Sequence, residues 1–189
     1  MPVLSSIFPV AHLFSYSFLF GSQIWHSFIG GIVAYRTIPR LQFGALQRRL
    51  FPIYFALQLV LSLVLLVTAP KSLKNNTTGP TYGFILTILI TALFNVAVAG
   101  PFTSKVINKR FAQEVFDGRS CDGKKLPDVT EGAERGGDKE NEEVRKSVEM
   151  VKLNKQFGMW HGLSSLANLG SVIATIGYGV LLAGKIRFH

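Results

Sequence analysis

The chain has 189 residues, of which 48% are hydrophobic, and its formal net charge at pH 7 is +9. This composition is too apolar for most soluble domains, and the length suits one compact unit. Residues 104–156 carry twelve Lys/Arg against eleven Asp/Glu. The remaining positive charge therefore lies beside apolar stretches, which is typical of membrane-helix flanks and argues against nucleic-acid binding. The lone Cys121 excludes an intrachain disulfide and a cysteine-cluster metal site.

The acidic residues are confined to one part of the chain. All eleven fall between Glu114 and Glu149. An ionised carboxylate at the centre of a bilayer costs at least a few kcal/mol, so lipid-facing segments exclude it. The segregation predicts an all-α fold, a four-span transmembrane helical bundle that forms a single polytopic membrane domain over residues 1–189.

Four apolar stretches are long enough to cross a membrane. In chain order the predicted spans are about 9–35, 51–69, 82–102 and 157–184. Apolar residues recur at helical spacing after Pro101, which predicts that the third span continues past a kink as an interfacial helix. Residues 117–141 are rich in Gly and charged residues and predict a disordered loop.

The distribution of basic residues predicts the orientation of the spans. The segments 36–49 and 104–156 carry sixteen Lys/Arg, whereas the opposite side has four, namely Lys71, Lys74, Lys185 and Arg187. By the positive-inside rule, loop 104–156 is cytosolic and both termini are non-cytosolic.

Polar side chains inside the predicted spans form stripes at helical spacing. Such stripes should converge on the interior of the bundle. The predicted intramembrane polar face consists of His12, Gln23, His26, Asn95, His161, Ser164, Ser165 and Asn168.

Three explanations of these stripes are open. The first is helix packing, with small residues as in Gly170-x-x-x-Ala174 and interhelical hydrogen bonds worth about 0.6 to 2 kcal/mol each. The second is a polar pathway for a solute. The third is haem or metal ligation by histidine, for which a His26/His161 pair is conceivable although the two are offset along the membrane normal. Catalytic motifs and phosphate loops are absent from the sequence, so we expect no enzyme activity, no catalytic residue and no cofactor.

A basic segment separates the first two spans. It is predicted to be a loop at the membrane surface, and its arginines are Arg36, Arg40, Arg48 and Arg49. Each basic residue near an anionic cytosolic leaflet contributes about 1 kcal/mol. Orienting the bundle would suffice as a role, and recognition of lipid headgroups or of a partner is the alternative. The expected partners are therefore the bilayer, anionic lipid headgroups and other membrane proteins, and not nucleic acid.

Three stretches together resemble the transmembrane protein 205 family. The outer two combine several residue types at fixed spacing, and Asn95, Pro101 and Thr103 form a weaker middle one. The outer stretches are Gly21-x-Gln23-x-Trp25-x-x-Phe28-x-x-Gly31, continuing through Arg36-x-x-Pro39-Arg40-x-x-Phe43-Gly44 to Pro52-x-Tyr54-Phe55, and Phe157-x-x-x-His161-Gly162-Leu163-Ser164-Ser165-Leu166-x-Asn168-Leu169-Gly170.

The resemblance implies a four-span bundle of the endomembrane system or plasma membrane, associated with trafficking and export. His12 and His161 match histidines of the family pattern, whereas His26 does not. We therefore expect a non-enzymatic multi-pass membrane protein that organises or traffics with other membrane components. The alternatives are a small-solute exporter or facilitator and, third, a haem- or metal-binding redox bundle.

Overall fold

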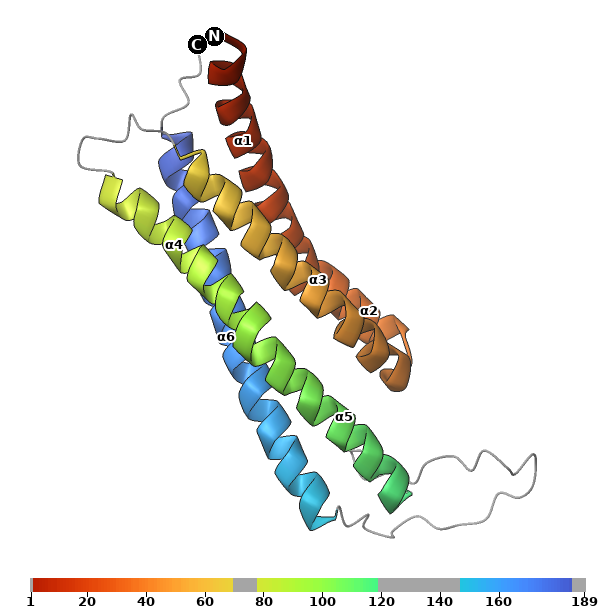
Figure 1. Cartoon of the computed structure of the whole chain (residues 1–189). Coiled ribbons are helices and arrows are strands. Elements are labelled where there is room, and N and C mark those ends of the chain that lie inside the picture. The colour runs from red at the N-terminus through yellow and green to blue at the C-terminus, as the bar shows by residue number, and fades with distance from the viewer. Residues whose placement is uncertain (1, 70–77, 119–146, 185–189) are drawn as a thin grey trace. The chain divides into compact units, whose positions relative to one another are not determined.

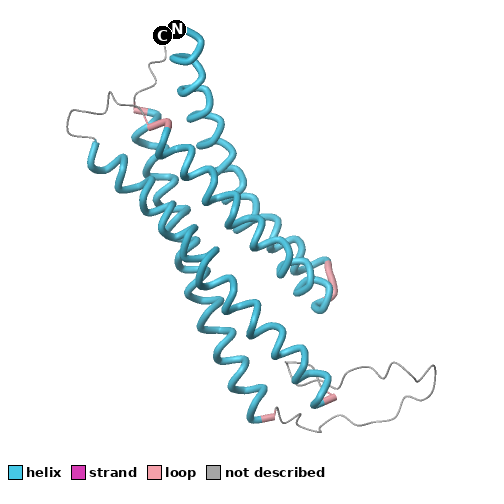
Figure 2. The backbone as a smooth tube through the Cα atoms, in the orientation of Figure 1, coloured by secondary structure: helices cyan, strands magenta, loops and turns pink. Residues whose placement is uncertain are grey.

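A computed structural model describes residues 2–69, 78–118 and 147–184, and within these ranges every regular element is helical (Figure 2). The all-α class is therefore confirmed for the described part of the chain. The elements, labelled in Figure 1, are α1 (Pro2–Ile24), η1 (Trp25–Gly30), α2 (Gly31–Thr37), α3 (Arg40–Val67), α4 (Thr78–Phe94), η3 (Asn95–Ala99), α5 (Gly100–Asp117) and α6 (Val148–Ala183).

The chain divides into two compact units. Unit 1 comprises Met1–Pro101 and Leu163–His189, and unit 2 comprises Phe102–Gly162. Helix α6 is continuous across the boundary and contributes its first part to unit 2 and the rest to unit 1.

Three helical stretches are long and apolar enough to cross a membrane: Gln42–Val67, Gly79–Asp117 and Val148–Ala183. The first predicted span, 9–35, lies within the consecutive segments α1, η1 and α2. This pattern is that of a helical membrane bundle.

The predicted basic loop between the first two spans is wrong, because this segment is almost entirely helical. Only Ile38 and Pro39 separate α2 from α3. Ile38 is extended (φ −101°, ψ 137°), as expected for the residue that precedes a proline, and Pro39 keeps its fixed φ near −53°. The proline thus breaks the helix within two residues, and α3 then begins at Arg40.

Two π-helical turns interrupt the helices of unit 1. In η1 the N–H of Gly31 donates to the carbonyl of His26, and in η3 the N–H of Gly100 donates to the carbonyl of Asn95. The second turn lies directly before Pro101, which has no N–H to donate. Residues 100–117 continue as helix α5 beyond the proline, as predicted, but the chain adapts to the proline through a wide turn.

Unit 1 exposes many large apolar side chains and buries several polar ones beside its apolar core. Large apolar side chains lie on its surface, among them Phe14 (70% exposed), Trp25 (63%) and Val67 (75%). Gln23, Gln58 and other polar side chains are fully buried. Lipid favours this arrangement, because hydrocarbon chains contact apolar side chains favourably and offer no hydrogen bonds. Polar groups therefore have to find partners within the protein.

The apolar core of unit 1 draws side chains from α1, α4 and α6 and from α3 with the residues directly after it. They are Leu19, Leu65, Ala69, Ile85, Ile88, Ala174 and Tyr178. Helix α3 lies against both α1 and α4. The four helices therefore share one interior.

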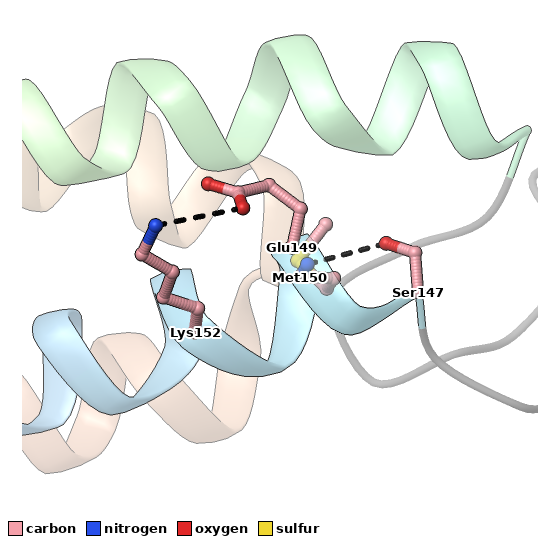
Figure 3. A network of polar contacts seen from close by, with 4 residues as sticks. All are labelled: Ser147, Glu149, Met150 and Lys152. Atoms are coloured by element: carbon pink, nitrogen blue, oxygen red, sulfur yellow. Dashed lines mark hydrogen bonds and ion pairs between the residues drawn. The ribbon is translucent and has the colours of Figure 1, made fainter.

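Unit 2 contains most of α5 and the first part of α6. The hydroxyl of Ser147 accepts a hydrogen bond from the N–H of Met150 (3.2 Å), which caps α6, and Lys152 pairs with Glu149 at 3.8 Å (Figure 3). The same hydroxyl donates to Asp117 Oδ2 at the end of α5 (2.6 Å). This bond ties the two helix ends together.

Aromatic contacts also join α5 to α6 in unit 2. Phe102 stacks on Trp160 with ring centroids 4.5 Å apart, and the Arg110 guanidinium lies 4.5 Å from the centroid of Phe157. Of the predicted disordered loop 117–141, all but residues 117 and 118 lies outside the described residues.

Candidate functional site

Asn168 on α6 connects three helical segments inside unit 1. Its Oδ1 accepts hydrogen bonds from the hydroxyl of Tyr54 (2.9 Å) and from Nε2 of Gln58 (3.1 Å), both on α3. Its Nδ2 donates to Oγ of Ser27 in η1 (2.9 Å). Ser27 Oγ also lies 3.4 Å from the Tyr54 hydroxyl. Through the oxygen and the nitrogen of its side-chain amide, Asn168 thus holds η1 and α3 to α6.

A second crossing bond lies one turn further along α6. Nε2 of Gln23 on α1 donates to Oγ of Ser171 (2.9 Å), and both residues are fully buried. The next polar residue, Thr175, donates to the carbonyl of Ser171 within the helix (2.9 Å). These bonds continue the polar interior from Asn168 toward the end of α6.

His12 closes this interior at the far end. Its Nδ1 lies 2.8 Å from the hydroxyl of Thr68, and its Nε2 is hydrogen-bonded to the hydroxyl of Tyr178. Thr68 donates its own proton to the carbonyl of Val64 (2.6 Å), so its oxygen has to accept from His12 Nδ1. Neutral His12 then carries its proton on Nδ1, and Nε2 accepts from Tyr178.

Three buried amide oxygens in this interior have no hydrogen-bond donor. They are Oε1 of Gln23, Oε1 of Gln58 and Oδ1 of Asn95. Gln23 and Gln58 are 0% exposed and Asn95 is 1% exposed. The other amide atom of each is bonded to α6, in the case of Asn95 through a long contact (3.5 Å) to the carbonyl of Ser164. The amides are therefore held in place while one polar atom of each stays unpaired.

The predicted polar face is only partly brought together. His12, Gln23, Asn95 and Asn168 make the buried contacts described above, whereas Ser165 is exposed. His26 packs against the rings of Tyr54 and Phe51, with centroid distances of 4.3 and 5.1 Å.

The stripe predicted that His161 would line the interior of the bundle, but the structure places His161 elsewhere. It belongs to unit 2, is exposed, and stacks on Phe157 with centroids 5.4 Å apart. Ser165 is exposed as well, so the buried side of α6 is narrower at these positions than the stripe predicted.

Several residues of the site were missing from the predicted face, among them Tyr54, Ser171 and Tyr178. On α6 the interior polar positions are 168, 171, 175 and 178, an alternation of three and four residues. Extending the heptad pattern from Asn168 to the end of the helix would have identified Ser171 and Tyr178. Tyr54 lies four residues before Gln58 and eight before Ser62 on α3, so extending that polar row backwards would have identified it.

The basic residues between α2 and α3 lie on helices. Arg36 lies in the last turn of α2, and Arg48 and Arg49 are in α3; all three side chains are exposed. For Arg40 the structure describes only the backbone, at the start of α3.

The described ranges contain no cluster of metal-ligating side chains. Within residues 2–69, 78–118 and 147–184, no three His, Cys, Asp or Glu side chains form a group that could hold a metal ion. Both ring nitrogens of His12 are hydrogen-bonded, so a metal could reach either one only by displacing Thr68 or Tyr178.

Comparison with known proteins places these features in a wider group. Residues 14–112 match a family described as a domain of unknown function, DUF4149. The chain is 30% identical to transmembrane protein 205 of Danio rerio over 168 residues, which cover 85% of this chain and 83% of that protein. It is 24% identical to xanthocillin biosynthesis cluster protein D of Aspergillus fumigatus over 190 residues, covering 98% and 95% of the two chains. No solved structure matches this chain.

Proposed function

Because the chain belongs to the transmembrane protein 205 family, we propose that it is a non-enzymatic multi-pass protein that organises or traffics with other membrane components. In this proposal four spans form the bundle, the membrane is that of the endomembrane system or the cell surface, and both termini are non-cytosolic. Partners contact loop 104–156, and anionic headgroups contact the exposed arginines of α2 and α3.

The hydrogen bonds of Asn168 are the observation that carries this proposal. These bonds, to Ser27, Tyr54 and Gln58, use side chains from different helices to hold the bundle closed. Interhelical bonds of this kind specify packing inside lipid. A bundle that is closed by its own side chains supplies a scaffold, and in this proposal the charged segment 119–146 supplies the contacts with partners.

Replacing residues 119–146 with a Gly/Ser linker of equal length tests the role of the loop. We expect the variant to keep the thermal stability of the wild type in detergent, to change its distribution among membrane fractions, and to lose neighbours in proximity labelling. A matched control scrambles residues 119–146 while keeping their composition. If the linker variant shows the same distribution and the same neighbours as the wild type, the proposed role of the loop is wrong.

A second candidate is a facilitator for small solutes. The observation that favours it is the polar row on α6, formed by Asn168, Ser171, Thr175 and Tyr178, which runs along the buried side of the helix. Polar residues that face a bundle interior mark solute pathways in many membrane proteins. Flux of candidate solutes into proteoliposomes tests this role, and a rate equal to that of protein-free liposomes would exclude it for the solutes measured.

A further inference from the structure

Four amide oxygens among the described residues of unit 1 are buried without a hydrogen-bond donor, in Gln23, Gln47, Gln58 and Asn95. Three of them, all but that of Gln47, belong to amides that bond to α6. Gln23 is bonded to Ser171, Gln58 to Asn168, and Asn95 to the carbonyl of Ser164. From position 164 to position 171 a helix rises about 10 Å at ~1.5 Å per residue. Three amides, from α1, α3 and η3, are therefore bonded to one short stretch of α6.

In each of these three amides the nitrogen donates a hydrogen bond to α6 and the oxygen accepts none. Turning the amide of Gln23 over would let Ser171 donate to the oxygen, but it would leave the nitrogen unpaired instead. Native structures leave few buried polar atoms without a partner, and such an atom calls for a water, an ion or a ligand. That three of them occur on neighbouring turns indicates one shared cause.

The helices are irregular at the same place. The π-helical turn η3 begins at Asn95 itself, and η1 begins at Trp25, two residues after Gln23. A π-helical turn widens the helix and changes the direction of the side chains that follow, and such turns occur frequently at functional sites. These backbone turns are a second observation, separate from the side-chain hydrogen bonds, in the same region.

The charge of the surroundings decides the class of ligand. Every acidic residue of the chain lies between Glu114 and Glu149, so residues 1–101 and 163–189 of unit 1 offer no carboxylate. A metal ion or an ammonium group would have no counter-charge and would be costly inside the membrane. An uncharged group that donates O–H bonds satisfies the oxygens without this cost.

We propose that Oε1 of Gln23, Oε1 of Gln58 and Oδ1 of Asn95 form a binding site for small uncharged hydroxyl donors. Water and a small polyol are the two sources of that chemistry. The site is distinct from the loop contacts of the proposed function, and binding requires no transport. Occupants are held between α1, α3, η3 and α6, where each donates to at least one of the three oxygens.

Water-edited solid-state NMR of the full chain in lipid bilayers tests the site directly. With the Gln, Asn and Ile side chains labelled, we expect magnetisation to pass from water protons to the three amides, while the fully buried Ile88 receives none. In a second arm, protiated glycerol in D2O identifies a polyol by transfer from its carbon-bound protons. Transfer in either arm supports the site and names its occupant. No transfer to any of the three amides in both arms would overturn the proposal.

Two variants show whether the oxygens themselves do the binding. Gln58→Met keeps the length of the side chain without its amide, and we expect transfer to Gln23 and Asn95 to be lost or strongly reduced. Thr81→Val is the control, because Thr81 is also fully buried with an unpaired hydroxyl but lies at the start of α4. Unchanged transfer to the amides in Gln58→Met would contradict a shared site. If that variant fails to fold, the wild-type measurement still decides.

Discussion

The Tyr178 hydroxyl donates to Nε2 of His12, and this bond joins two residues that are 166 positions apart. His12 in turn donates through Nδ1 to Thr68, so that α1 and α6 are held to the end of α3. The rings of His12 and Tyr178 meet edge to face with centroids 5.8 Å apart. This end of unit 1 is therefore closed by a histidine whose tautomer is fixed by its neighbours.

Replacing Tyr178 with Phe should destabilise the bundle without changing its packing. The ring stays, but Nε2 of His12 loses its donor inside the bundle. We expect a loss of about 1 kcal/mol, typical of an interhelical bond in a membrane protein. Thermal unfolding in detergent measures it. Tyr35→Phe is the matched control, because Tyr35 is 70% exposed and its hydroxyl should not matter to the fold. Equal unfolding temperatures for the two variants would contradict this account.

Asn168→Ala should be more harmful than the loss of a single bond. It removes the partner of Ser27, Tyr54 and Gln58 at once. With ~0.6 kcal/mol for each of the bonds, the loss is about 2 kcal/mol. Ser165→Ala on the same helix is the control, since Ser165 is exposed. Thermal stability of both variants in detergent makes the comparison.

A flux measurement distinguishes the two roles of the Asn168 region. If the region serves packing alone, Asn168→Ala should lower stability while any solute flux per folded molecule stays unchanged. If it lines a pathway, flux should fall with little change in stability. A variant that alters neither property would show that the stripe faces lipid or water, contrary to the contacts of Asn168.

Much of the fold is readable from the sequence because lipid imposes simple rules. The absence of carboxylates outside 114–149 and the long apolar stretches predicted an all-helical membrane protein. The helix starts were less predictable. Basic residues after Pro39 suggested a loop, but a proline needs only the preceding residue to be extended, so α3 begins at Arg40.

The site was harder to predict than the fold, because periodicity gives a helical face but does not give its partner. Asn168 and Gln23 were predicted to lie on interior faces, and the structure places Asn168 in contact with α3 and Gln23 in contact with α6. Helical spacing puts Tyr54 on the same face of α3 as Gln58, but it does not give Asn168 as the residue to which Tyr54 donates. The π-helical turns also shift the register in a way that no simple period reproduces.

Close packing between α1 and α6 predicts a position-specific effect of adding a methyl group. A Cβ built at Gly179 would lie 1.9 Å from the Tyr16 hydroxyl, whereas one at Gly170 meets nothing within 4 Å. Gly179→Ala should therefore displace Tyr16 and cost about 1–3 kcal/mol, as overpacking does. Gly170→Ala should be neutral or slightly stabilising, because alanine favours the helix. The expected close approach at Gly170 in the Gly170-x-x-x-Ala174 pattern is thus found at Gly179 instead.

Unfolding temperatures of the two glycine variants in the same detergent give the comparison. Tyr16 stacks on Phe20 and meets Tyr178 edge to face, so its displacement should also broaden the aromatic signals of Tyr178 in NMR spectra. A Gly179→Ala protein as stable as Gly170→Ala would mean that α1 and α6 are further apart than the structure places them.

The proposed orientation in the membrane rests on sixteen Lys/Arg on one side against four on the other. Protease added to sealed vesicles whose cytosolic face is outward should cut between Asp117 and Asn141 and spare both termini. Epitope tags at the two ends and an antibody to residues 119–141 identify the fragments. Detergent-permeabilised vesicles are the control and should lose the tags as well. Protection of the loop together with cleavage of both tags would reverse the orientation, and the exposed arginines of α2 and α3 would then face the non-cytosolic side, where an anionic leaflet could not attract them.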